Sequence, residues 1–184
     1  MLILASASPR RHALLCAAGI DHVVRTASVA EQRHPGESPT AFVQRIAEAK
    51  ARAVVCSPTD LVLGADTVVC PGDDKEELFG KPTDDEDASR MLRRLSGRDH
   101  YVHTGICLVS GTGTILDVST TRVSFIQLSE SEIREYTRSG EPRDKAGAYG
   151  IQGLASKFIS SIEGCYHNVV GLPVSLVYRY LKAL

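Results

Sequence analysis

The distribution of hydrophobic and polar positions along the chain predicts a mixture of strands and helices. Short apolar runs without helical spacing are typical of buried strands. Such runs cover residues 2–5, 22–27, 61–65 (continued by 67–70), 101–109, 115–125 and 158–162. The fourth and fifth runs flank a Gly-Thr-Gly turn at 111–113, which predicts a long hairpin. Because helical stretches separate the other runs, the pattern indicates an α/β fold.

Helix starts are marked by capping residues and prolines. Ser8 and Ser38 each precede a proline, which predicts helices from 9 to about 19 and from 39 to about 56. Two capping boxes, at 83–86 and 129–132, predict two more helices. Pro173 opens a terminal helix, and polar residues 28–37 and 71–78 are expected to form loops.

Composition places the chain among ordinary globular proteins. It has 184 residues, of which 43% are hydrophobic and 23% charged, so its apolar content can offset chain entropy and disorder is not expected. The length suits one core or a two-lobed domain. The formal net charge of -1 offers nothing to attract a long polyanion, which disfavours a nucleic-acid-binding module.

Cysteine and histidine usage argues for a reducing compartment and against a zinc site. The odd number of cysteines, without zinc-ligand spacing, indicates reduced core thiols: Cys16, Cys56, Cys70, Cys107 and Cys165. The six histidines also show no ligand spacing: His12, His22, His34, His100, His103 and His167. No signal peptide or membrane-spanning run is visible, so we expect a cytoplasmic protein with no membrane partner. A metal, if used, would be Mg or Mn on carboxylate and phosphate oxygens.

Residues 6–11, SASPRR, follow a strand and open a helix. A helix N-terminus offers free amides and a positive dipole end, and two arginines add forked donors for phosphate. A capped helix with two surface arginines explains the same residues, and taken alone that interpretation is favoured.

Asp66 interrupts the apolar run 61–70. An acid at such a break lies at a strand end over a cleft, is buried at a cost, or is an ordinary turn residue. Glu31, Lys50 and Lys81 are each unremarkable alone and are typical of solvated surface positions. The stretch 144–153, DKAGAYGIQG, combines three glycines with charged, aromatic and amide side chains, and favours a binding site.

Taken in order, these segments resemble the Maf family of nucleotide pyrophosphatases. Each match is weak alone, but the ordered set spans nearly the whole chain. The matching pieces are 6–11, Glu31, Lys50, 64–67 (GADT), 80–82 (GKP), 95–97 (LSG), 144–153 and 170–173 (VGLP). The resemblance implies that residues 1–184 form a single domain. Its fold would be α/β, with an elongated, twisted mixed sheet flanked by helices and a deep cleft between two lobes.

The resemblance also implies an activity and roles for named residues. The reaction would be hydrolysis between the α- and β-phosphates of a nucleoside triphosphate with Mg or Mn. Asp66 matches the catalytic base and Glu31 a second acidic catalytic position. Asp66 would either take the proton of the attacking water or, with Glu31, hold the metal. Phosphate-facing positions are Arg11, Lys50 and Lys81, the last also counted as catalytic. Substrate-binding positions are completed by Ser8, Arg10, Thr67, Lys145 and Gln152.

The finer resemblance is to the branch that hydrolyses dTTP and UTP, because of Arg10, Thr67 and the YGIQ loop at 149–152. In the branch that acts on 7-methyl-GTP, the first motif reads Ser-Pro-Trp, where this chain has Ser8-Pro9-Arg10. Many members carry two adjacent acids at the loop position, whereas here Ala30 precedes Glu31. Alternatives are a pyrophosphatase for other or modified nucleotides and a non-catalytic, nucleotide-sensing regulator of cell division. Self-association as a homodimer is left open.

Overall fold

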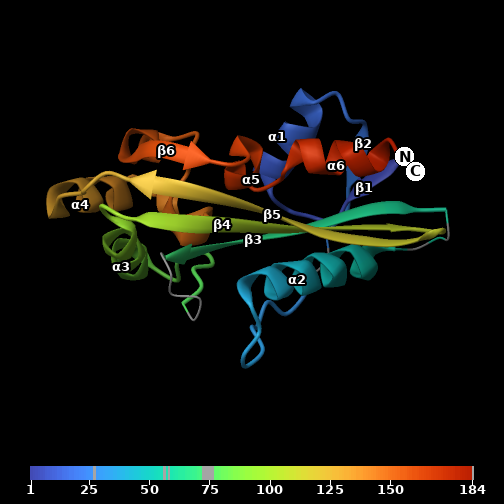
Figure 1. Ribbon diagram of the computed structural model, residues 1–184, viewed down its shortest axis with the longest axis horizontal. Coiled ribbons are helices and arrows are strands. Elements are labelled where there is room, and N and C mark those ends of the chain that lie inside the picture. The colour runs from blue at the N-terminus through green and yellow to red at the C-terminus, as the bar shows by residue number, and fades with distance from the viewer. Residues whose placement is uncertain (27, 56, 58, 72–76, 184) are drawn as a thin grey trace. The chain divides into compact units, whose positions relative to one another are not determined.

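The computed structural model describes residues 1–26, 28–55, 57, 59–71 and 77–183. Its strands form a six-stranded sheet in the order β2-β1-β3-β4-β5-β6 (Figure 1). The strands are β1 Leu2–Leu4, β2 His22–Val24, β3 Leu61–Pro71, β4 Asp99–Ser110, β5 Gly113–Phe125 and β6 Ile159–Glu163. Strand β1 is parallel to both β2 and β3, whereas β5 and β6 are antiparallel. The sheet is therefore mixed, as the resemblance implies.

Helices flank the sheet, and most begin where capping residues place them. They are α1 Pro9–Ala17, α2 Pro39–Val54, α3 Asp85–Leu95, α4 Glu130–Arg138, α5 Tyr166–Val170 and α6 Val174–Leu181. Short 3-10 helices are η1 Glu141–Asp144, η2 Ala146–Ala148 and η3 Leu154–Phe158. In the part of the chain described here, no helix is long and apolar enough to cross a membrane.

The capping predictions are confirmed at three helices and wrong at one. Ser8, Ser38 and Ser129 are the N-caps of α1, α2 and α4, and Ser129 forms the expected capping box with Glu132. Helix α3 is capped by Asp84 instead of Thr83. The Asp84 carboxylate accepts the backbone N–H of Asp87 at 2.7 Å, because this N–H lies three residues into the helix.

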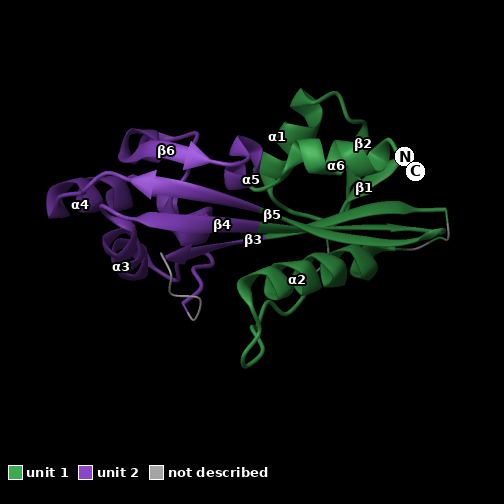
Figure 2. Ribbon diagram, in the orientation of Figure 1, with its two compact units in different colours: residues 1–66, 104–119, 171–184 green, residues 67–103, 120–170 purple. Residues whose placement is uncertain are grey.

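The chain divides into two compact units (Figure 2). Unit 1 comprises residues 1–66, 104–119 and 171–184, and unit 2 comprises 67–103 and 120–170. Strands β3, β4 and β5 each contribute residues to both units. The cleft expected between two lobes stays a prediction.

In unit 1 the core lies between helix α2 and the strands. Ala47 and Ala51 of α2 are fully buried together with Val62 of β3. The small side chains allow α2 to approach β3 closely, and the approach is closest at Gly64. A Cβ atom at Gly64 would overlap the carbonyl oxygen of Ala47, so only glycine lets α2 lie this close to β3.

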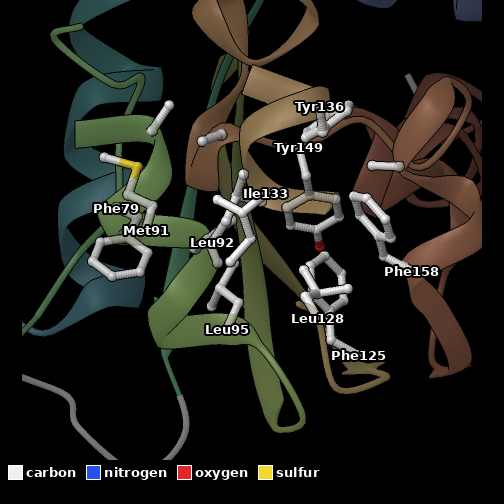
Figure 3. Close-up of a cluster of buried hydrophobic side chains, with 14 of the residues drawn as sticks. Phe79, Met91, Leu92, Leu95, Phe125, Leu128, Ile133, Tyr136, Tyr149 and Phe158 are labelled. Carbon is white, nitrogen blue, oxygen red and sulfur yellow. The ribbon is translucent and has the colours of Figure 1, made fainter. Parts of the chain in front are cut away.

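Unit 2 has its own core, built around aromatic side chains (Figure 3). Phe125 and Tyr149 meet edge-to-face with ring centroids 4.8 Å apart, and Tyr136 meets Phe158 in the same way at 5.4 Å. Apolar side chains of α3 and α4 complete the cluster, among them Met91, Leu92, Leu95 and Ile133. The loop that contains Tyr149 is thereby held to the body of the unit.

Several expectations need correction. Strand β2 ends at Val24, and Ala27, the predicted strand end, lies outside the described residues. Helix α5 was not predicted. Cys16 is exposed, so it is not a core thiol, whereas Cys70 and Cys107 are buried as expected. Cys56 and residues 72–76 of the predicted loop lie outside the described residues.

Candidate active site

A buried ion pair in unit 1 joins helix α2 to strand β3. Nζ of Lys50 donates to Oδ1 of Asp66 at 2.7 Å, and the two side chains are 14% and 9% exposed. Strand β3 continues through Asp66 without a break, so the strand-end interpretation is wrong and the buried alternative is correct. Gly64, two residues earlier on β3, permits the helix approach that brings Lys50 within reach.

The same ammonium also pairs with Glu31. Oε1 of Glu31 lies 2.7 Å from Nζ of Lys50, although the Glu31 side chain is 52% exposed. Two carboxylates, one buried and one open to water, therefore share a single lysine. The structure brings together three sequence-predicted site residues that lie far apart in the chain.

Arg11 is buried beside this cluster and bonds to the protein itself. Its Nε donates to the carbonyl oxygen of Gly171 at 2.7 Å. Its Nη1 donates to the carbonyl oxygen of Ala65 at 2.8 Å and to Oγ of Ser6 at 3.1 Å. Arg11 thus fastens the first turn of α1 to the strand that carries Asp66. Its phosphate-facing role stays a prediction.

Burial sets the protonation behaviour of the pair formed by Asp66 and Arg11. Burial raises the pKa of Asp66, against the opposing effects of Lys50 and Arg11. Burial also lowers the pKa of Arg11, against the attraction of Asp66. Both shifts have the same cause, since a charged group loses hydration inside the protein. A carboxylate with a raised pKa accepts a proton more readily, which suits a general base.

The first turn of α1 adds polar groups. Oγ of Ser8 accepts the backbone N–H of Arg11 at 3.5 Å, and the backbone N–H of Ser8 donates to Oγ of Ser6 at 3.2 Å. Ser8 and Arg10 are half-buried. The substrate-binding roles expected of both residues stay predictions.

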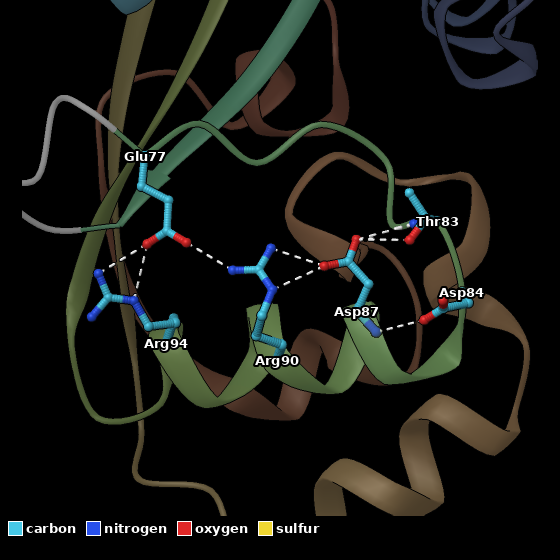
Figure 4. A network of polar contacts seen from close by, with 6 residues as sticks. All are labelled: Glu77, Thr83, Asp84, Asp87, Arg90 and Arg94. Atoms are coloured by element: carbon cyan, nitrogen blue, oxygen red, sulfur yellow. Dashed lines mark hydrogen bonds and ion pairs between the residues drawn. The ribbon is translucent and has the colours of Figure 1, made fainter.

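Unit 2 holds Lys81 on a segment that is anchored at both ends (Figure 4). At one end, Glu77 pairs with Arg90 and Arg94 of α3. At the other, the backbone N–H of Thr83 donates to Oδ2 of Asp87 at 3.1 Å. Lys81 lies between these anchors and is exposed. Its ammonium makes no hydrogen bond or ion pair with the described residues, so it is available to an anion.

The 144–153 loop contacts this segment. The backbone N–H of Gly147, a residue with φ of +70°, donates to the carbonyl oxygen of Gly80 at 3.0 Å. Lys145 is turned onto its own loop, where Nζ donates to Asp144 at 2.8 Å and to the carbonyl oxygen of Glu141 at 2.7 Å. Two predicted segments of unit 2 therefore meet, while the binding role of Lys145 stays a prediction.

Gln152 and Thr67 differ from Lys145 in their surroundings. The Gln152 side chain is exposed and makes no hydrogen bond with the described part of the chain. Thr67 follows Asp66 on β3 and is half-buried. The carboxamide of Gln152 is not used to brace its loop, which leaves it able to bind a ligand.

Sequence reasoning missed the residue that organises the loop, Glu141. Its Oε1 accepts the hydroxyl of Tyr136 at 2.9 Å, and its Oε2 accepts the backbone N–H of Leu154 at 2.9 Å. A Cβ atom at Gly153 would overlap the Glu141 carboxylate, so a larger residue there would make the Glu141 side chain shift. The glycine was visible in the sequence, but its partner was not.

Sequence spacing gave no sign that two histidines lie side by side, and the expected absence of histidine metal ligation stays a prediction. Nδ1 of His12 lies 2.8 Å from Nε2 of His22, and the thiol of Cys16 lies beside them. His12 and Cys16 are on α1 and His22 starts β2, so the fold, more than a sequence motif, brings the three side chains together.

Asp66 and Glu31 also fit a hard divalent cation. Mg and Mn bind through oxygen atoms, commonly one or two carboxylates together with substrate phosphates. The two acids converge on one positive charge, that of Lys50. The chemistry of this donor set agrees with the predicted metal.

Comparison with known proteins first defines the class. The fold is similar to that of the Staphylococcus aureus Ham1 protein, with a TM-score of 0.51 and 11% identity over 99% of this chain and 98% of that one. The chain therefore has a Ham1-like α/β fold, and the candidate site combines acidic and basic side chains.

The Maf-like protein family matches residues 1–184, so the chain belongs to the Maf family. Three similar relatives are each named dTTP/UTP pyrophosphatase. The one from Symbiobacterium thermophilum is 51% identical and covers 98% of this chain and 92% of its own. Those from Koribacter versatilis and a Geobacillus species are 49% and 48% identical, covering 98% and 100% of this chain and 93% and 97% of theirs.

Proposed function

We propose that this protein is a nucleoside triphosphate pyrophosphatase that hydrolyses dTTP and UTP to the monophosphate and pyrophosphate. The observation that carries the proposal is the near-complete alignment with relatives of that name at about half identity. The cluster of Asp66, Lys50 and Glu31 supports it, because charged groups brought together from separate elements suit phosphate chemistry. Removal of unwanted nucleotides from the pool is the corresponding cellular role.

Asp66 would act as the general base. Water attacks the α-phosphorus, a new P–O bond forms, and a proton of this water passes to the Asp66 carboxylate. The bond from the α-phosphorus to the bridging oxygen breaks, and pyrophosphate leaves. Lys50 holds the Asp66 carboxylate in one orientation for this proton transfer.

Asp66 and Glu31 would hold the divalent metal. When bound, Mg or Mn neutralises phosphate charge and makes phosphorus more open to attack. Lys50 balances the two carboxylates, and Glu31, which is half exposed, can turn toward an incoming cation without leaving the site.

Other site residues would bind the substrate. In unit 2, the exposed ammonium of Lys81 suits the phosphates, and the carboxamide of Gln152 suits a base edge. Lys145, Thr67, Ser8, Arg10 and Arg11 complete the proposed set. We also propose that residues 1–184 act as one domain in the cytoplasm, on a small nucleotide and not on nucleic acid, and that a homodimer is compatible with this role.

A substrate panel tests the proposal. The protein is stripped of metal with EDTA, dialysed, and assayed with UTP, dTTP, CTP, ATP and GTP, each with and without Mg or Mn. We expect turnover of UTP and dTTP that returns with added metal. Full activity in excess EDTA would contradict metal dependence. Absence of turnover with every nucleotide would favour a nucleotide-sensing regulator.

A further inference from the structure

The first helix and the strand that follows it bring two imidazoles and a thiol together. His12 and Cys16 lie four residues apart on α1, so they share one helix face. The chain then turns back, and His22 begins β2 beside that face. The candidate ligand atoms of the three residues all lie within 4.8 Å of one another.

The ring nitrogens of His22 have separate partners. Nδ1 lies 2.8 Å from the carbonyl oxygen of Ile20. Since a carbonyl oxygen only accepts, Nδ1 carries the hydrogen, and a neutral His22 has its lone pair on Nε2. Nε2 faces His12, whose Nδ1 donates to it at 2.8 Å. A ring nitrogen fixed by a backbone carbonyl is the usual support of a metal-binding histidine.

The separations of the three groups are close to those around a tetrahedral cation, with the two nitrogens nearer together. Bonds of about 2.0–2.1 Å to nitrogen and about 2.3 Å to sulfur place the ligand atoms roughly 3.3–3.6 Å apart. The two nitrogens here are 2.8 Å apart, and Sγ of Cys16 lies 3.7 Å from Nε2 and 3.8 Å from Nδ1 of His12. Small side-chain rotations would open the pair of nitrogens enough to admit the ion.

We propose that His12, Cys16 and His22 form a second metal site, for a zinc-type transition cation. Imidazole and thiolate ligands select such ions over Mg and Mn, which prefer oxygen. His12 and Cys16 are exposed, so the fourth coordination position faces solvent and takes a water molecule. On binding, the cation takes the place of the hydrogen between the imidazoles, which moves to Nε2 of His12 as that ring changes tautomer, and the thiol releases its proton to the buffer.

The expected consequence is a stabilised unit 1. The site would join α1 to β2, and α1 carries Arg11, the residue fastened to Gly171 and Ala65. A cation that binds the folded chain more tightly than the unfolded chain stabilises it by mass action. The proposal is independent of the catalytic one, because its ligands and readout involve neither Asp66 nor Glu31.

Cobalt titration of the full chain tests this site. The chelator-stripped protein is titrated with Co²⁺, which reports thiolate ligation by a charge-transfer band and tetrahedral geometry by its visible bands. We expect one equivalent to give both signals and Zn²⁺ to displace it. The variants Cys16→Ser, His12→Ala and His22→Ala should each lose the signals. A control variant, Cys165→Ser with His167→Ala, alters a thiol and a histidine elsewhere and should retain them.

Two results of the cobalt titration would overturn the proposal. One is a charge-transfer band that persists in Cys16→Ser. The other is its loss in Asp66→Asn, which would place the cation at the carboxylates. A measurement without variants gives a further check: Zn²⁺ should protect Cys16 from alkylation, as read by peptide mass spectrometry, and should raise the melting temperature. Unchanged alkylation of Cys16 at saturating Zn²⁺ would refute the site.

Discussion

Nζ of Lys50 lies 2.7 Å from Oδ1 of Asp66, so a helix residue and a strand residue form one buried ion pair. Lys50 also holds Glu31 at 2.7 Å, which leaves the lysine paired if Asp66 loses its charge. Because Lys50 has two partners, the role of Asp66 in activity and the role of Lys50 in stability can be tested by different substitutions.

Asp66→Asn should abolish most activity without unfolding the protein. The amide keeps the size of the side chain but cannot act as a base, a loss that typically costs about 10²–10⁴ in rate. Lys50 still has Glu31 as a partner, so the melting temperature should change little. The measurements are kcat for UTP and a thermal melt. Asp99→Asn, which alters a carboxylate of the exposed pair with Arg122, is the matched control.

Full activity of Asp66→Asn, with the control equally active, would show that another acid is the base. Glu31→Gln would then be the next substitution to measure. A large fall in melting temperature would instead assign Asp66 a mainly structural role.

Lys50→Met should make stability depend on pH. In the wild-type protein burial already raises the pKa of Asp66, and Lys50 opposes that rise. Without Lys50 the folded-state pKa rises further above the unfolded value. A raised carboxyl pKa gives stability that is present at low pH and lost as pH rises through the folded-state pKa. The variant should therefore lose more stability than wild type as pH increases. Thermal melts across the acid and neutral range measure this.

Lys182→Met is the control for the loss of a positive charge, because Lys182 is exposed and lies over the Tyr178 ring. The difference in melting temperature between this control variant and wild type should be the same at every pH. A Lys50→Met variant whose difference from wild type is also independent of pH would contradict the assigned coupling.

Gly64→Ala should destabilise unit 1. The added methyl group would overlap the backbone of Ala47 and Ala51 and push α2 from β3. Overpacking of this kind costs about 1–3 kcal/mol, and each kcal/mol lowers the melting temperature of a chain this long by roughly 2–4 °C. Gly80→Ala serves as the stability control, since a Cβ there meets nothing within 4 Å. Equal melting temperatures for the two variants would refute the close approach.

Gln152→Ala should flatten base selection. Uracil and thymine present an N–H donor beside a carbonyl acceptor, and a carboxamide can pair with both at once. A site that pairs with a polar edge discriminates because a wrong base leaves groups unpaired. We expect UTP and dTTP to be best, CTP intermediate, and ATP and GTP poor, with kcat/KM for UTP falling more than for ATP in the variant.

The control is Gln127→Ala. The carboxamide of Gln127 donates to Oγ of Ser96, so it serves a contact within the protein and has no proposed role in base selection. It should keep the preference for UTP over ATP. An unchanged ratio of UTP to ATP activity in Gln152→Ala would refute base reading by Gln152.

Local signals in the sequence predicted much of the fold. Ser8, Ser38 and Ser129 cap helices through contacts a few residues away, so their patterns identify helix starts. Thr83 failed because Asp84, the neighbouring residue, offers an equally good cap. Helix α5 has five residues, too few to show a periodic pattern.

The candidate site was predictable as a set of residues, but its contacts were not. The ordered motifs named Asp66, Lys50 and Glu31 as site residues. They did not show that both carboxylates pair with the Lys50 ammonium, because that contact depends on the approach of α2 to β3. Glu141 and the pair of His12 and His22 were missed for the same reason. The contacts of these residues depend on how separate elements pack together, which a local sequence pattern does not predict.

Product analysis tests the central claim most directly. UTP is incubated with the protein and Mg or Mn in water enriched in ¹⁸O, and the products are followed by ³¹P NMR and mass spectrometry. Hydrolysis between the α- and β-phosphates predicts UMP and pyrophosphate, with the label in UMP because water attacks the α-phosphorus. Primary release of UDP and orthophosphate would contradict the account.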